Sequence, residues 1–182
     1  SSKAFSYAGE RCAVLGISNK LAQRRFPDLK DFCGQEIFLR GILFGALHPL
    51  SSGTSHSAQY ALAGVLKAVN DGTYNYREDV LEYGRKAKMM KDAFISAGFN
   101  FTYDEDLGEP IADGFYFTYC YPGFSGAELL EKMLYYGISA ISLDTCGSTR
   151  QGIRACTSLI QRDEIPVLAE RLKRFAEDHP LR

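Results

Sequence analysis

Apolar residues recur at helical spacing in the first half of the chain. They predict helices over residues 20–25, 36–47 and 57–69. We expect His48-Pro49 to stop the second helix, because proline lacks the amide hydrogen that a helix interior uses. Ahead of these helices, the largely apolar residues 11–17 predict a strand.

Capping signals mark two further helices. Asn75 and Glu78 have the spacing of a capping box at the start of a long helix, which we expect to end at Gly98. Ser125 with Glu128 repeats the signal at the start of a shorter helix. Both starts are therefore fixed by side chains that satisfy the first backbone amides.

The C-terminal part alternates between strand and helix patterns. Residues 115–121, 138–143 and 152–159 predict strands. A last helix places three apolar residues on one face, namely Leu168, Leu172 and Phe175. The order strand, helix, strand, strand, helix suits a small α/β domain.

The composition is that of a globular protein. Of 182 residues, 46% are apolar and 24% are charged, enough to bury a core in one domain or in two unequal pieces. Lys and Arg number 21 against 22 Asp and Glu, and no basic block occurs. We therefore expect no nucleic-acid partner.

Cysteine usage and apolar run lengths exclude other classes. Five cysteines, an odd number without Cys-x-x-Cys spacing, argue against a disulfide framework and against a metal site. They suit the reducing cytoplasm. The apolar runs are too short to cross a bilayer, so we expect no membrane partner.

The first eleven residues carry the most specific chemical signal. They read Ser1-Ser2-Lys3-Ala4-Phe5-Ser6-Tyr7-Ala8-Gly9-Glu10-Arg11 and could place two cations around one small anionic ligand. A lone lysine is ordinarily solvated surface. This segment, however, resembles the Schiff-base signature of class I/II aminotransferases of fold-type I, roughly Ser-Lys-x-Phe-x-x-x-Gly-x-Arg, and each of its positions matches.

The resemblance implies pyridoxal 5'-phosphate as cofactor. By that resemblance Lys3 forms the Schiff base, Arg11 holds the phosphate, and Ser2 is the adjacent cofactor-binding serine. It also implies a homodimeric, cytoplasmic enzyme that moves an amino group between an α-amino acid and a 2-oxo acid. In the family about half of the protein precedes the lysine, so the chain resembles a C-terminal fragment that we expect to be inactive alone.

A second match lies far along the chain, at Arg154. In a strand over residues 152–159, Ile153 and Ala155 share the face opposite to Arg154 and Cys156. The resemblance implies that Arg154 grips the substrate α-carboxylate with its planar fork. The alternative from the residues alone is an arginine paired with a neighbouring Asp or Glu.

The implied fold is α/β, a partial fold-type I transferase. Residues 1–81 would be the remnant of the large cofactor domain with the start of the connecting helix. Residues 82–182 would hold the rest of that helix and the small α/β domain, with the boundary near Glu82.

Two other functions fit the same residues. A lyase, decarboxylase or synthase on this scaffold shares Lys3, Arg11 and Arg154, and only its products differ. An aminotransferase-like effector domain of a transcription regulator would not be an enzyme at all. The substrate side chain is not encoded in these residues.

Several other polar residues are better explained without chemistry. The three histidines, His48, His56 and His179, are scattered and lack metal spacing. The hydroxyl-rich residues 51–57 fit either a capped loop or a phosphate or interface contact. Cys156 is expected to be a small buried hydrophobe, and Tyr116 an ordinary strand residue.

Overall fold

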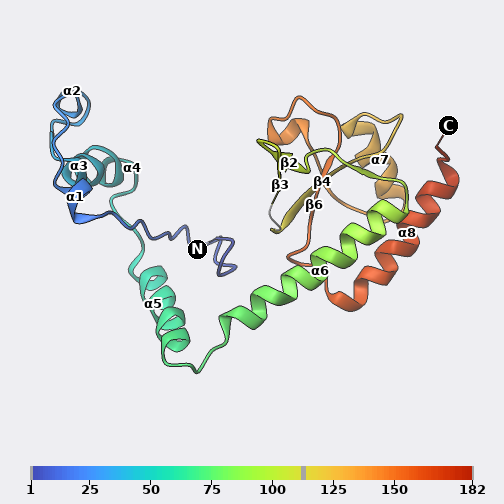
Figure 1. Ribbon diagram of the computed structural model, residues 1–182, viewed down its shortest axis with the longest axis horizontal. Coiled ribbons are helices and arrows are strands. Elements are labelled where there is room, and N and C mark those ends of the chain that lie inside the picture. Colours follow the sequence, from blue (N-terminus) through green and yellow to red (C-terminus); the bar gives the residue numbers. More distant parts are fainter. Residues whose placement is uncertain (1, 112–113, 182) are drawn as a thin grey trace. The chain divides into compact units, whose positions relative to one another are not determined.

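A computed structural model describes residues 2–111 and 114–181. The chain forms two compact units, Ser1–Asn75 and Tyr76–Arg182, which are described separately (Figure 1). The protein is mixed α/β, with many helices and small antiparallel sheets. The division between the two units falls at the start of the long helix, and the family-domain boundary expected near Glu82 stays a prediction. The helix belongs to the second unit, where its buried residues are Lys86, Ala87, Met90 and Phe94.

The first unit is helical. Ser18 begins its first helix, where its Oγ accepts a hydrogen bond from the Leu21 amide at 3.3 Å. Gly45 lies so close to Cys33 that an added Cβ would sit 2.1 Å from the Cys33 Cβ, so the contact requires glycine. The α-helices of this unit are α1 (Asn19–Ala22), α2 (Leu29–Cys33), α3 (Phe38–Arg40), α4 (His48–Ser51) and α5 (His56–Asn70).

The helical segment around Pro49 is longer than the sequence predicts. After α3 the chain passes into a π-helix, η1 (Gly41–Leu47), and α4 follows directly. The expectation that His48-Pro49 stops the helix is therefore wrong. Pro49 lies in the first turn of α4, a position that tolerates the missing amide donor, and the wider π turn precedes it. The run ends at Ser52, whose φ is 54°.

Residues 11–17 form no strand, which corrects the sequence prediction. A strand needs a neighbour for its backbone groups, and the one extended pairing among the described residues of the first unit is the bridge between Arg25 and Ile37. Val14 and Leu15 are 78% and 69% exposed. Among the described residues of the first unit, residues 11–17 therefore have no partner strand of the kind that their apolar pattern predicts.

A small core in the first unit holds the opening segment. Cys12 is buried with Ala58 and Leu62 of α5, and Phe5 and Tyr7 pack against them. The helix predicted over residues 57–69 is thus confirmed, and it anchors the aromatic residues of the opening motif.

The long helix α6 spans Tyr76–Ser96, as its pattern predicts. Gly98 follows its end with a φ of 86°, and the Phe99 amide donates back to the Phe94 carbonyl at 3.1 Å. Lys86, Met90 and Phe94, which repeat every four residues, are all buried. This face of α6 is the one that meets the rest of the second unit.

A four-stranded antiparallel sheet forms the centre of the second unit, in the order β1-β4-β6-β5. The predicted strand at 115–121 is confirmed as β4, which pairs with β6 so that Thr118 lies opposite Arg154. A separate hairpin joins β2 and β3. The strands are β1 (Asn100–Phe101), β2 (Glu105–Asp106), β3 (Glu109–Pro110), β4 (Tyr116–Cys120), β5 (Ile141–Ser142) and β6 (Ile153–Cys156).

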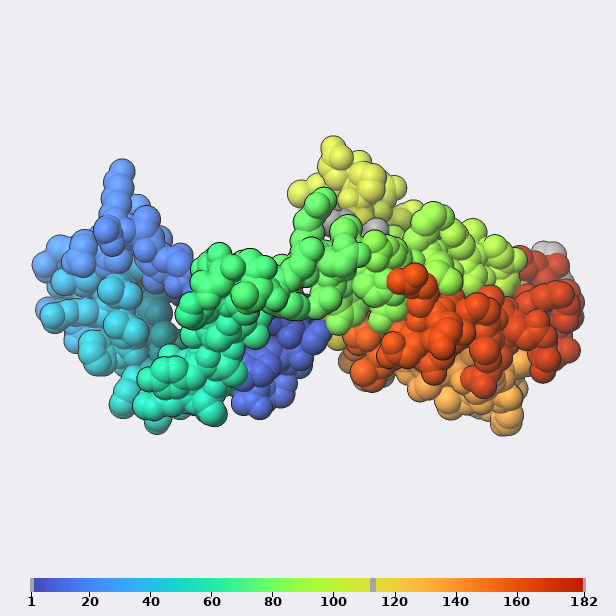
Figure 2. Space-filling model, turned by 90° about the horizontal axis from the view of Figure 1, so that it is seen from below, coloured from blue at the N-terminus to red at the C-terminus, as the bar shows by residue number. Residues whose placement is uncertain are grey.

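Two helices complete the second unit, α7 (Gly126–Tyr135) and α8 (Ile165–Asp178), with short 3-10 turns η2 (Asp144–Cys146) and η3 (Arg162–Glu164). The capping box of Ser125 and Glu128 is confirmed. The helix α8 lies beside α6 in both views (Figures 1 and 2). Its predicted apolar face is also confirmed, because Leu172 and Phe175 are fully buried and Leu168 packs beside them.

The two C-terminal strands are shorter than predicted. The segment 138–143 pairs only over β5, and 152–159 only over β6. Alternation along the predicted strand 152–159 would place Leu159 on the face of Ile153 and Ala155, but Leu159 is 88% exposed because the chain bends over residues 158–160 after β6. The inward face predicted for β6 holds for Ile153, Ala155 and Thr157, which are buried.

Candidate functional site

Strand β6 carries Arg154 on the face of the sheet opposite to the core. Its neighbours Ile153 and Ala155 point into the core, so alternation turns Arg154 the other way, as predicted. Arg154 is half-buried and lies opposite Thr118 of β4 and Ile141 of β5. Strands on both sides therefore fix the backbone from which this guanidinium projects.

The guanidinium of Arg154 stacks on an aromatic ring. Its central carbon lies 4.4 Å from the centroid of the Tyr116 ring, a cation–π contact between diagonal neighbours on paired strands. Within residues 2–111 and 114–181, no Asp or Glu forms an ion pair with Arg154. The structure therefore gives no support to the alternative of an arginine neutralised by a neighbouring carboxylate.

The face around Arg154 adjoins a hollow. Tyr116 and Thr118 line a cavity of about 270 Å³ that also touches Tyr103 and Lys91. The Tyr103 amide donates to Thr118 Oγ1 at 3.0 Å, which fixes that hydroxyl. Asp104 also lines this cavity and Arg154 does not, so Tyr116 is what the cavity and the arginine share. The planar guanidinium of Arg154 suits a carboxylate by its own geometry.

Two consecutive turns shape the opening segment, which contains Ser2, Lys3 and Arg11. The Ser6 amide donates to the Lys3 carbonyl at 3.5 Å, and the Arg11 amide donates to the Ala8 carbonyl at 3.4 Å. Ser6 and Arg11 both take positive φ, 52° and 50°, a conformation that costs free energy for residues with a Cβ. The motif is thus folded back on itself in turns.

Cationic side chains of this segment are exposed while its aromatic side chains pack on α5. Lys3 and Arg11 are both exposed, and Ser2 is half-buried. One guanidinium nitrogen of Arg11 donates to the Ala8 carbonyl at 2.8 Å. Partial burial, with Glu10 and Cys12 nearby, raises the pKa of Tyr7. An exposed amine and an exposed guanidinium on an anchored turn can both reach an anionic ligand.

The sequence-predicted residues fall into the two units. Ser2, Lys3 and Arg11 lie together in one short segment of the first unit, and Arg154 lies in the second.

Cys156 differs from its expectation. It was expected to be a small buried hydrophobe, but it is exposed on the face that carries Arg154, with its Sγ 3.1 Å from Ser158 Oγ. The difference arises because the helices of this unit cover the opposite face of β6, where Ala155 is buried.

The remaining polar candidates make contacts within their own parts of the fold. Among the described residues, no group of three or more His, Cys, Asp or Glu side chains could hold a metal ion. In the hydroxyl-rich loop, Ser51 Oγ donates to the Leu47 carbonyl at 2.8 Å, and Ser55 and Ser57 share a hydrogen bond of 2.8 Å. The His179 ring packs 4.8 Å from Phe175.

The contacts of two residues, Tyr116 and Lys86, were not predicted from the sequence. Tyr116 was expected to be an ordinary strand residue, and only the strand register shows that it lies under the guanidinium. Lys86 was not singled out, although a lysine in line with Met90 and Phe94 was a signal that its side chain would be buried.

No known family model matches the chain, and a search of curated proteins finds no match. Along the described chain, no helix is both long and apolar enough to cross a membrane. The functional interpretation therefore rests on the residues and their geometry.

Proposed function

We propose that the chain is the C-terminal part of a class I/II aminotransferase that moves an amino group between an α-amino acid and a 2-oxo acid. The observation that carries the proposal is the match of Ser2, Lys3, Phe5, Gly9 and Arg11 to the Schiff-base signature. The outward-facing arginine of β6, in the expected order along the chain, adds to it.

The donor set of the opening segment fits pyridoxal 5'-phosphate. The Lys3 amine is the attachment point for an aldehyde, and the Arg11 guanidinium and Ser2 hydroxyl suit a phosphate. Both cations are exposed on turns that Phe5 and Tyr7 anchor to α5. When bound, this cofactor supplies an electron sink for the carbanion formed at the substrate α-carbon.

Each residue of the chain has a distinct task in this proposal. Lys3 would hold the cofactor until the substrate's amino group takes its place, and then, as a neutral amine, would take the proton from the substrate α-carbon and pass it to the cofactor. Arg154 binds the α-carboxylate through two parallel hydrogen bonds, supported by its cation–π contact with the Tyr116 ring. Orientation of the substrate by this clamp selects which bond is broken.

Product analysis on the parent protein tests the proposal and separates it from the lyase, decarboxylase and synthase alternatives. With an α-amino acid donor and a 2-oxo acid acceptor, we expect a new amino acid and a new 2-oxo acid in equal amounts. Lys3→Ala should abolish their formation, and Lys20→Ala, which alters an exposed lysine of α1, should not. Carbon dioxide or an elimination product in their place would contradict the assignment.

A further inference from the structure

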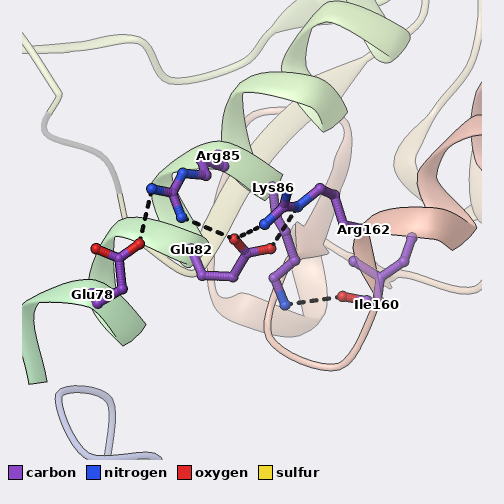
Figure 3. Close-up of polar contacts among 6 residues, drawn as sticks. All are labelled: Glu78, Glu82, Arg85, Lys86, Ile160 and Arg162. Carbon is purple, nitrogen blue, oxygen red and sulfur yellow. Dashed lines mark hydrogen bonds and ion pairs between the residues drawn. The ribbon is translucent and has the colours of Figure 1, made fainter. Parts of the chain in front are cut away.

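Lys86 is a buried lysine in the middle of α6, with 6% of its surface exposed. Its Nζ donates to the Ile160 carbonyl at 2.9 Å (Figure 3). It also approaches the Ser158 carbonyl at 3.4 Å. It also lies 5.0 Å from the centroid of the Tyr83 ring. Burial of an ammonium group is costly unless its protons are satisfied, so these contacts account for its position.

The two carbonyl acceptors belong to the bend that follows β6. Strand β6 ends at Cys156, and the chain bends over residues 158–160. Leu159, at the centre of the bend, is exposed. The Leu159 side chain therefore does not hold the bend. Ile160 packs against the core, and the charge-assisted hydrogen bonds from Lys86 bind the backbone carbonyls of the bend.

A second contact from the same helix holds the far side of the bend. Glu82, one turn before Lys86 in α6, accepts from Arg162 Nε at 2.9 Å and pairs with a second nitrogen of the same guanidinium (Figure 3). These hydrogen bonds, with those from Arg85, hold the pKa of Glu82 below its ordinary value. Two residues on one face of α6 therefore hold this region: Lys86 binds the bend, and Glu82 binds Arg162, which follows it.

The bend is connected to the face on which Arg154 lies. Ser158, whose carbonyl Lys86 approaches, has its hydroxyl 3.1 Å from Cys156 Sγ, and Cys156 shares the face of Arg154. We propose that Lys86 is a positioning residue for Arg154: it fixes the end of β6 and so orients the guanidinium for a carboxylate. This inference rests on the proposed function of Arg154 and adds a residue to it.

Carboxylate binding to the 182-residue chain tests the inference. Propionate is the probe, and the side-chain Nε–Hε resonance of Arg154 is followed by NMR. For the unchanged chain we expect a shift of this resonance that saturates with propionate. In Arg154→Gln, which lacks that resonance, propionate should not shift the signals of the neighbouring residues. Lys86→Met should raise the dissociation constant about fivefold, in the range of couplings measured for residues that act through a neighbour. Lys86→Arg, which keeps a charged donor, should restore most of the affinity.

Two matched controls separate positioning from general effects. Lys88→Met removes a lysine of the same helix whose side chain is 77% exposed and pairs with Asp92. Leu129→Ala removes a fully buried side chain and lowers stability away from the bend. Both should leave propionate affinity unchanged. If Leu129→Ala weakens binding as much as Lys86→Met, the effect is global and the inference is overturned.

The remaining outcomes are also decisive. If Lys86→Met folds and binds propionate like the unchanged chain, Lys86 does not position Arg154, and the proposed function stands. If that variant does not fold, Glu82→Gln replaces it, and unchanged affinity there overturns the inference as well. If the unchanged chain shows no Arg154-dependent binding, the role proposed for Arg154 fails and the inference fails with it.

Discussion

At the scale of single residues, Arg154 combines three properties. It is half-buried, it stacks on Tyr116, and no carboxylate among the described residues pairs with it. An arginine serving only as a surface charge gains little from such an environment, because exposed pairs contribute at most about 1 kcal/mol. A guanidinium that lies over an aromatic ring, and that no described carboxylate neutralises, is suited to binding an anion.

Replacement of Arg154 by lysine keeps the charge but removes the planar fork. In the parent protein, Arg154→Lys should weaken transition-state binding by ~2–3 kcal/mol, which is measured as a fall in kcat/KM for the amino acid. Pyridoxal phosphate should stay bound. Steady-state kinetics and the absorbance of the bound cofactor measure the two effects. Arg150→Lys is the control, because Arg150 also stacks on a tyrosine, Tyr103. Unchanged kcat/KM in Arg154→Lys would remove Arg154 from the site.

Some site residues were predictable from local pattern and others were not. Alternation along β6 gave the outward direction of Arg154, because side-chain period in a strand depends only on neighbouring residues. The partner Tyr116 depends on strand register, and Lys86 depends on a contact 74 residues away. Neither relation can be predicted from a short stretch of sequence, because each depends on residues that are far apart along the chain.

At the scale of elements, a hydrogen bond joins the end of α7 to the end of α8. Tyr136 follows α7, and its hydroxyl donates to a carboxylate oxygen of Asp178 at the end of α8, at 2.7 Å. This hydrogen bond, with partial burial, raises the pKa of Tyr136 to about 12. The Tyr136 ring also packs on Phe175 in the core.

The pH dependence of stability should report this contact. Because the folded pKa lies above the ordinary value of 10.0, the contribution is complete below pH 10 and is lost as the pH rises toward about 12. Tyr136→Phe should therefore lower the free energy of unfolding at pH 8, and the gap to the unchanged chain should narrow above pH 10. Urea unfolding at pH 8 and pH 11 measures it. A gap that is equal at both pH values would show that the hydroxyl does not bind Asp178.

Elements with strong local signals were predicted well. The capping box at Ser125 and the long α6 needed only neighbouring residues. The two failures have a common cause. Residues 11–17 lack a partner strand among the described residues. Pro49 lies in the first turn of α4, directly after the π-helix η1, so its missing amide donor does not end the helical segment. Both outcomes depend on hydrogen-bond partners that a pattern of apolar residues does not specify.

At the scale of the whole molecule, the proposed chemistry draws on both units. The residues proposed for the cofactor, Ser2, Lys3 and Arg11, lie in the first unit, and the residue proposed for the substrate carboxylate, Arg154, lies in the second. Each unit has its own buried core. The proposal thus assigns cofactor binding and substrate binding to separately packed parts of one chain.

The most direct test of this account is where pyridoxal phosphate attaches. The parent protein is incubated with the cofactor, reduced with borohydride, digested, and mapped by mass spectrometry. We expect the pyridoxyl group on Lys3, its loss in Lys3→Ala, and its retention in Lys20→Ala. A pyridoxyl group on another lysine, or its persistence in Lys3→Ala, would contradict the assignment of Lys3 as the cofactor-binding residue.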